Sequence, residues 1–203
     1  MNKNYNGELL EFELLDLPQF EEYTFWEQAK KRNLIINSII DDSLVERVIM
    51  QIIKINGEDK DLPRNKRKPI NIFINTCGGA VDVGMALCST IKTSITPVNG
   101  IVLGKAYSMG GLILLACHKR MAYEFSTILL HDGSLEMTSS SKKAKDTMAF
   151  YDKLEVKIRN FVINNSKITE EKYDEMYGNE WYMFSDEAKG HGIIDEIIGC
   201  DNN

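Results

Sequence analysis

The chain has 203 residues and a hydrophobic fraction of 43%, which is enough to bury a full core without disulfides or a structural metal. Its formal net charge of −6 argues against a nucleic-acid partner, because phosphates require a basic face. The one basic cluster, residues 64–68, is flanked by Asp59 and Asp61, and we interpret it as a solvated loop.

Targeting and metal-binding patterns limit the function further. The first 16 residues mix acids with leucines, and Lys3 is their only basic residue, so we expect no secretory signal. The longest apolar run, residues 112–117, is too short to span a bilayer, and we expect no membrane partner. The histidines lie far apart, so we expect no metal and no other cofactor.

None of the four cysteines stands in a Cys-x-x-Cys pair. Cys77, Cys88 and Cys117 lie in a region whose composition predicts burial. Both observations favour reduced thiols, and we expect a cytoplasmic protein.

The amino-terminal part divides into an arm and the start of a domain. Residues 1–31 have no clean period, and we interpret them as an arm that packs on a neighbouring subunit or as a tail with one short helix. The domain itself is expected over residues 32–198, beginning with a strand at 34–36. Ser43 and Glu46 match a capping box, which predicts a helix from there to about Ile55, followed by a polar loop over 57–69.

Strands and helices then alternate along the middle of the chain. Apolar runs predict strands at 70–75, 98–103, 121–125 and 128–131, and helices at 80–93 and 108–117. This alternation predicts an α/β fold with a largely buried sheet.

The longest predicted helix covers residues 139–164 and is amphipathic. Its apolar stripe consists of Ala144, Met148, Tyr151, Ile158, Phe161 and Val162. We interpret the face with Lys142, Lys145, Lys153 and Glu155 as the solvent-facing one. A short helix is expected after Thr169, with acids in its first turn.

The segment around Ser108 can carry a nucleophile. Ser108 lies between a predicted strand and a predicted helix, with Gly104, Gly110 and Gly111 close by. This position lifts the hydroxyl out of the sheet and sets it at a helix start, where backbone amides favour negative charge. The simpler interpretation is a serine that caps a buried helix.

Two further elements can complete such a site. Gly78 and Gly79 follow a strand, where they form an ordinary tight turn or bring backbone amides close to an oxyanion. His131 ends an apolar strand, 23 residues after Ser108, and is either structural or a general base. His118 and His191 are weaker candidates.

A base of this kind needs a carboxylate that orients it. Asp132 is a poor candidate, because consecutive strand side chains point to opposite faces. The physical pattern does not choose among the remaining acids, which are Asp174, Glu180, Asp186 and Asp195.

Three motifs in series resemble the proteolytic subunit of the ATP-dependent Clp protease, a serine peptidase. They are residues 74–79 (Ile-Asn-Thr-Cys-Gly-Gly), residues 104–110 with Ser108-Met109-Gly110, and Leu130-His131. Their order and spacing match this family over roughly residues 32–196, and the closing Glu187-Ala188 pair agrees with it.

The resemblance implies a spiral of strand-strand-helix units, shared with the crotonases, in which residues 139–164 form a helical handle. It implies that residues 32–198 are the peptidase domain and residues 1–31 an arm or axial segment. It also implies a homo-oligomer of two stacked seven-membered rings, in whose chamber unfolded polypeptides delivered by an AAA+ ATPase are hydrolysed.

The resemblance also assigns the site residues. Ser108 corresponds to the nucleophile and His131 to its base, with the backbone amides of Gly79 and Met109 as the oxyanion hole. The family has its third catalytic residue, an aspartate, seven positions before the glutamate of its Glu-Ala pair. In this chain that position holds Glu180.

This and other departures mark a divergent member of the family. Thr76-Cys77 stands where the family has Ser-Pro, and Asp132-Gly133 where it has Gln-Pro. An alternative hypothesis is therefore a catalytically weak or inactive ring subunit with a structural role. A third hypothesis is a crotonase-like acyl-CoA enzyme, which would not need a serine paired with a histidine.

Overall fold

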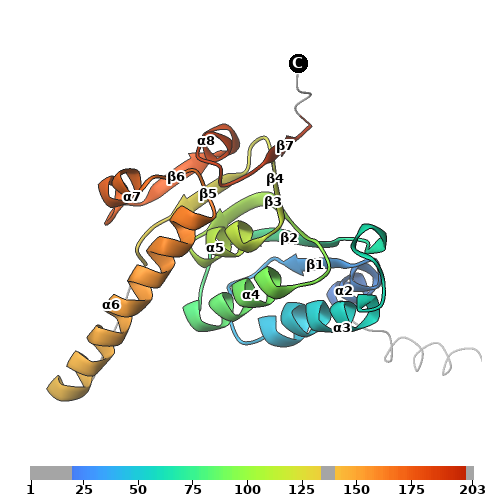
Figure 1. Ribbon diagram of the computed structural model, residues 1–203, viewed down its shortest axis with the longest axis horizontal. Helices are drawn as coiled ribbons and strands as arrows, with labels where there is room; N and C mark the ends of the chain where they lie inside the picture. Colours follow the sequence, from blue (N-terminus) through green and yellow to red (C-terminus); the bar gives the residue numbers. More distant parts are fainter. Residues whose placement is uncertain (1–19, 134–139, 200–203) are drawn as a thin grey trace, which may run out of the picture.

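Isoleucine-rich segments build the central sheet of the molecule (Figure 1). The computed structural model describes residues 20–133 and 140–199 of the chain. Every second side chain of the strand at residues 70–76 is buried, and several of these side chains are completely inaccessible. The strands are β1 (Asn33–Ile36), β2 (Ile70–Thr76), β3 (Val98–Tyr107), β4 (Lys119–Tyr123), β5 (Thr127–Leu130), β6 (Trp181–Phe184) and β7 (Glu196–Ile198).

Helices cover the sheet and extend beyond it. In chain order they are α2 (Phe20–Lys30), a π-helical turn (Val45–Ile49) that continues into α3 (Met50–Asp59), a 3₁₀ turn (Arg64–Lys66), α4 (Val81–Thr93), α5 (Met109–Ala116), α6 (Ser141–Asn164), α7 (Glu170–Met176) and α8 (Ser185–Gly190). All eight residues of α5 are buried, whereas α6 projects from the body (Figure 1). No helix in the described ranges is both long and apolar enough to cross a membrane.

The sheet forks at β3, and this fork places the functional residues. The order β1-β2-β3-β4-β7 is parallel throughout, and β4 pairs with the amino-terminal half of β3, at Asn99–Val102. The carboxyl-terminal half, Lys105–Tyr107, pairs instead with β5, and β5 pairs antiparallel with β6. The register between β2 and β3 shifts just before this point, after Ile74.

Asparagine side chains fix the register of the first three strands. The Asn71 amide donates to Asn33 Oδ1 and the Asn99 amide donates to Asn71 Oδ1, both at 3.0 Å. Each asparagine lies opposite the next in the parallel pairing, so the side-chain ladder and the backbone ladder specify the same alignment.

The structure confirms most of the predicted elements and corrects several details. The capping box at Ser43 is wrong: the Ser43 amide donates to the Asp41 carboxylate, and the residue that begins the π-helical turn has no side-chain cap. The helix also runs past Ile55 to Asp59, because Gly57 is accommodated within it and Asp59 is held at its end. The short strands β6 and β7 were not predicted.

The cysteines differ in part from the predicted burial. Cys77 is exposed, because it lies on the turn after β2, whereas Cys88 and Cys117 are buried as predicted. Burial raises the pKa of the Cys88 thiol to about 12. Residues 1–19 of the predicted arm and the predicted helix start at Ser139 lie outside the described residues, and the domain boundary at residue 32 stays a prediction.

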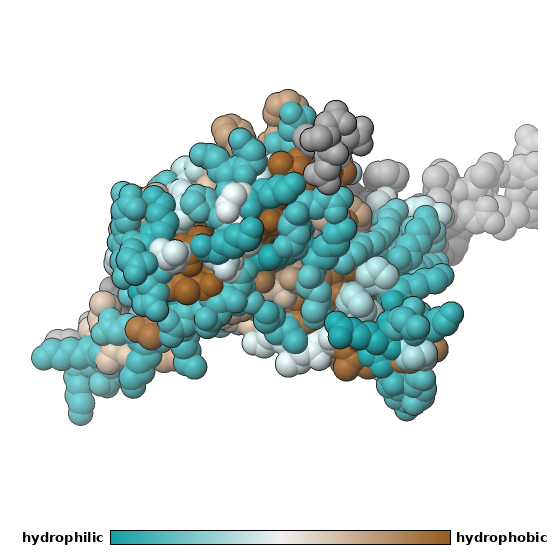
Figure 2. Space-filling view, turned by 45° about the horizontal axis from the view of Figure 1, so that its top comes forward, coloured by the Kyte–Doolittle hydropathy of each residue, from teal (hydrophilic) through white to brown (hydrophobic). Residues whose placement is uncertain are grey.

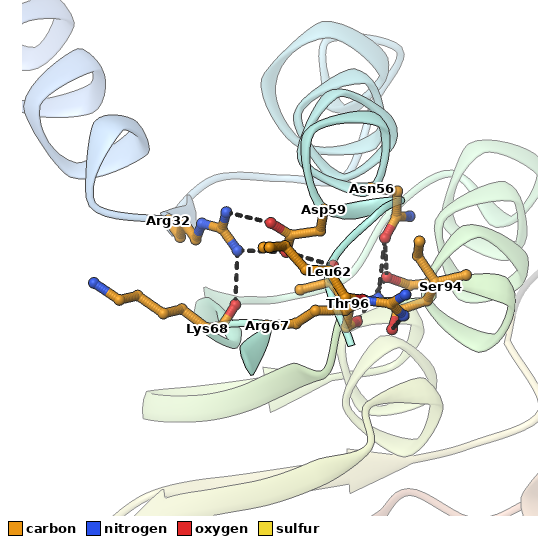
Figure 3. A network of polar contacts seen from close by, with 9 residues as sticks. Arg32, Asn56, Asp59, Leu62, Arg67, Lys68, Ser94 and Thr96 are labelled. Atoms are coloured by element: carbon orange, nitrogen blue, oxygen red, sulfur yellow. Dashed lines mark hydrogen bonds and ion pairs between the residues drawn. The ribbon is translucent and has the colours of Figure 1, made fainter. Parts of the chain in front are cut away.

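A buried ion pair ties the end of α3 to the chain that leads into β1 (Figure 3). Arg32 donates from both terminal nitrogens to the Asp59 carboxylate, at 2.7 Å each. Thr96 Oγ1 adds a third donor to Asp59 at 2.8 Å, and Asp59 is almost completely buried. The hydrogen bonds from Arg32 therefore hold the pKa of Asp59 below its ordinary value.

Asp59→Asn should lower the free energy of unfolding by about 3 kcal/mol at neutral pH, because it leaves Arg32 without its counter-charge. A lowered folded-state pKa contributes stability above the unfolded carboxyl pKa of about 4, and this contribution is lost as pH falls through the folded value. Urea unfolding of the parent protein and of Asp59→Asn should therefore show that the difference in their free energies of unfolding becomes smaller at acidic pH. The matched control is Glu58→Gln, which removes an exposed pair with Lys54 and should change stability by less than about 1 kcal/mol. Equal losses in the two variants would contradict the argument.

Candidate active site

Ser108 stands alone between β3 and α5 in an uncommon backbone conformation. Its φ is 54° and its ψ is −120°, a region that costs free energy for a residue with a side chain. The Ser108 amide donates to the Leu129 carbonyl at 2.9 Å, and the Ser108 carbonyl accepts from the Gly111 amide at 2.9 Å. These bonds hold the sharp strand-to-helix turn that presents the hydroxyl group.

The turn after β2 packs directly against the turn at Ser108. Gly78 has a φ of 96°, and a Cβ atom there would lie 2.7 Å from Ser108 Cβ and 2.8 Å from the Tyr107 carbonyl oxygen. Gly110 allows a similar approach of α5 to β2, since a Cβ atom there would lie 2.6 Å from Thr76 Cγ2. The glycines of both motifs are thus required by packing around the serine.

The strand pairing brings three predicted residues into line. His131 follows β5, whose residue Leu129 lies opposite Tyr107 of β3. Glu180 precedes β6, where Trp181 lies opposite Leu130 in the antiparallel pair. One step beyond that last pair, on the same side of it, His131 and Glu180 are consequently neighbours.

The distances among these side chains form a continuous hydrogen-bonded chain. His131 Nε2 lies 2.8 Å from Ser108 Oγ, and His131 Nδ1 lies 3.1 Å from Glu180 Oε1. The His131 side chain is 19% exposed and the Glu180 side chain 57% exposed, so the carboxylate approaches the ring from the solvent side. The geometry is that of a hydroxyl, a base and an orienting carboxylate.

The other candidate carboxylates form ion pairs with arginines or lie on the surface. Asp174 accepts two hydrogen bonds from Arg159, and Asp195 accepts hydrogen bonds from Arg120. Asp186 is exposed in the first turn of α8. Of the four acids left open by the pattern, Glu180 is the one that the structure places against His131.

The two weaker histidine candidates have structural contacts. His118 Nδ1 accepts from the Val98 amide at the start of β3, the end of the strand remote from Ser108. His191 packs edge-on against the Trp181 ring, with the ring centroids 4.9 Å apart. Within the described residues, no group of three His, Cys, Asp or Glu side chains is placed to bind a metal.

The two predicted oxyanion amides belong to the turn after β2 and to the start of α5. Around Gly79, the Ile40 amide donates to the Gly78 carbonyl and the Ala80 amide donates to the Ile40 carbonyl, both at 2.8 Å. The Gly79 amide takes no part in these two bonds. The Met109 amide belongs to the first residue of α5, where an N–H has no intrahelical partner. The oxyanion role of both amides stays a prediction.

A pocket beside Ser108 contains residues that the sequence pattern did not assign to the site. Glu155 is exposed, as expected for the solvent-facing side of its helix, and it also lines this pocket, where it accepts a hydrogen bond from the Tyr177 hydroxyl at 3.0 Å. A signal was present: Glu155 lies three and seven residues before Ile158 and Val162, and it therefore shares their helix face. Asp132, expected to be a poor orienter, also lines the pocket.

Fold and comparison agree on the class of this protein. The mixed α/β architecture, with its parallel sheet and covering helices, is of the type found in Clp proteolytic subunits, as predicted. The family model described as Clp protease matches residues 19–201. The chain therefore belongs to the Clp protease family, and it is a Clp-like peptidase.

Gly78→Ala should lower the free energy of unfolding by at least about 2 kcal/mol, because the new methyl group has no space beside Ser108 and alanine is strained at positive φ. The matched control is Gly57→Ala within α3, where nothing lies within 4 Å of the position that the methyl group would take. The control should gain roughly 0.5–1 kcal/mol, since alanine is the better helix former. Urea unfolding measures both changes, and a Gly78→Ala variant as stable as the parent would show that the two turns are not in tight contact.

Proposed function

We propose that this chain is a serine endopeptidase in which Ser108 is the nucleophile, His131 the general base and Glu180 the residue that orients it. The observation that carries the proposal is the continuous contact from Ser108 Oγ through both ring nitrogens of His131 to Glu180. A serine that merely caps a buried helix would not require a histidine and a carboxylate aligned behind it.

The reaction follows from these positions. Ser108 Oγ attacks the scissile carbonyl carbon while His131 Nε2 takes the hydroxyl proton, and the carbonyl π electrons move to the oxygen. The amides of Gly79 and Met109 donate hydrogen bonds to that oxyanion. His131 returns the proton to the leaving amine as the C–N bond breaks. A water molecule, deprotonated by His131, then hydrolyses the acyl-enzyme and restores Ser108.

We further propose that the subunit works within an assembly. Several large apolar side chains are exposed on the single chain, among them Phe150 and Val156 on α6 and Phe125 after β4. Figure 2 shows apolar patches on a face that is otherwise hydrophilic. Exposed apolar area of this kind favours partners. The proposed assembly is two stacked seven-membered rings in the cytoplasm, which enclose the sites and receive unfolded polypeptides from an AAA+ ATPase.

Ser108→Ala should abolish peptide hydrolysis, with a loss of about 10⁴- to 10⁶-fold in kcat, because the bond-forming oxygen is removed. A fluorophosphonate should label the parent protein at Ser108 and leave the variant unlabelled, which mass spectrometry of the tryptic peptide can measure. The particle mass, measured by light scattering, should be the same for both proteins. A parent protein that neither reacts nor hydrolyses peptides would establish the alternative of an inactive ring subunit.

Glu180→Gln should reduce kcat by about two to four orders of magnitude, because the amide favours the wrong imidazole tautomer. Glu180→Asp should be milder, since it keeps the charge. The control is Asp174→Asn, which removes a carboxylate from the same region but from contact with Arg159 rather than His131. Turnover numbers with one fluorogenic peptide would decide. Parent-like kcat in Glu180→Gln would mean that the enzyme works as a Ser-His dyad.

A further inference from the structure

The pocket beside Ser108 has an apolar body. Its walls come from α4, α5, β5 and the residues that follow β5, α6, α7 and β6, which converge next to the nucleophile. The apolar side chains that line it include Leu112, Leu130, Ile158, Val162, Met176 and Trp181. A side chain of the substrate that enters here lies next to the bond that Ser108 attacks, so the pocket is placed to select it.

The polar part of the lining is acidic. Asp132 and Glu155 contribute two carboxylates, and Tyr173 and Tyr177 contribute two phenols. Among the described residues that line the pocket, none is a lysine or an arginine. The Tyr177 hydroxyl donates to Glu155 Oε2, which positions that carboxylate against the pocket wall.

Two basic groups close to this lining are engaged by carboxylates of their own, which weakens their effect on these charges. Arg159, whose guanidinium lies 5.8 Å from the centre of the Tyr173 ring, is bound by Asp174 and Glu170. Lys172, which lies over the Trp181 ring, is bound by Glu175.

The two phenols lie close to the carboxylates of Asp132 and Glu155. The hydrogen bond to Glu155, together with the nearby charges, raises the pKa of Tyr177. Burial raises the pKa of Tyr173, Tyr177 and the two carboxylates raise it further, and Arg159 acts in the opposite direction. The pocket is therefore apolar along its body and negative at its polar edge.

We infer that this pocket selects a substrate residue with a long apolar stem and a positively charged end, namely lysine or arginine immediately before the scissile bond. The selection rests on the proposed serine-peptidase function. The methylene stem packs on the apolar walls, and the ammonium or guanidinium group lies within reach of Glu155 and Asp132. An acidic side chain at the same position is repelled by both carboxylates.

An uncharged side chain of the substrate contacts only the apolar walls of this pocket and gains nothing from its carboxylates. Norleucine has the stem of lysine without the ammonium group, so comparing the two isolates the contribution of charge. A charge-assisted hydrogen bond at a partly exposed site corresponds to roughly a tenfold preference. The preference should decrease with added salt, because Glu155 and Asp132 remain in contact with solvent.

The test is a set of fluorogenic peptides that differ only in the residue before the cleaved bond: lysine, arginine, norleucine, leucine and glutamate. For the parent protein, kcat/KM should be about tenfold higher for lysine than for norleucine and lowest for glutamate. Glu155→Gln should reduce the lysine-to-norleucine ratio several-fold, and Glu155→Lys should reverse the order of lysine and glutamate. The control Glu58→Gln, on α3 and outside the pocket, should leave the ratio unchanged.

The outcomes separate the selectivity from the underlying activity. Hydrolysis of leucine or norleucine peptides at least as fast as lysine peptides, or a ratio that Glu155→Gln does not change, would overturn the selectivity alone. Absence of hydrolysis for all peptides, together with absence of fluorophosphonate labelling at Ser108, would overturn the proposed function and the selectivity with it.

Discussion

The close contact between two chain turns, one after β2 and one after β3, is the constraint on which the rest of the site depends. Only glycine fits at position 78, because Ser108 Cβ and the Tyr107 carbonyl oxygen occupy the space that a side chain would need. Ser108 in turn begins a helix whose eight residues are all buried. The position of the candidate nucleophile is therefore determined by core packing, which is more rigid than a surface loop.

The carboxylate side of the site is built differently. Glu180 is mostly exposed and reaches His131 from the start of a four-residue strand, so the pairing of β5 with β6 decides its position. Glutamate in place of the family's aspartate is compatible with this arrangement, since its Oε1 still lies 3.1 Å from the imidazole. Asp132 is a second departure from the family pattern, and with Glu155 it gives the neighbouring pocket a negative edge.

Sequence reasoning predicted the features that depend on local pattern. Apolar periodicity located most strands and helices, and glycines near Ser108 indicated a tight turn where one exists. Glu180 could not be chosen on physical grounds, because its proximity to His131 depends on an antiparallel pair between residues about fifty positions apart. Glu155 is exposed as expected, but its place at the pocket was not predicted for a related reason, because the pocket forms only where α7 packs beside α6.

The fork in the sheet has a consequence for how the site loses order. Ser108 follows β3, which belongs to the main five-strand path, whereas His131 follows β5 and Glu180 precedes β6, the two strands that form the branch off that path. This branch consists of two strands of four residues each. The main sheet has five strands, and the asparagine ladder adds side-chain hydrogen bonds between the first three of them. Local opening of the short branch would move His131 and Glu180 away from Ser108 while most of the hydrophobic core stays folded. The subunit can thus lose its aligned site at a free-energy cost below that of global unfolding, and hydrogen exchange at β6 would report that smaller cost.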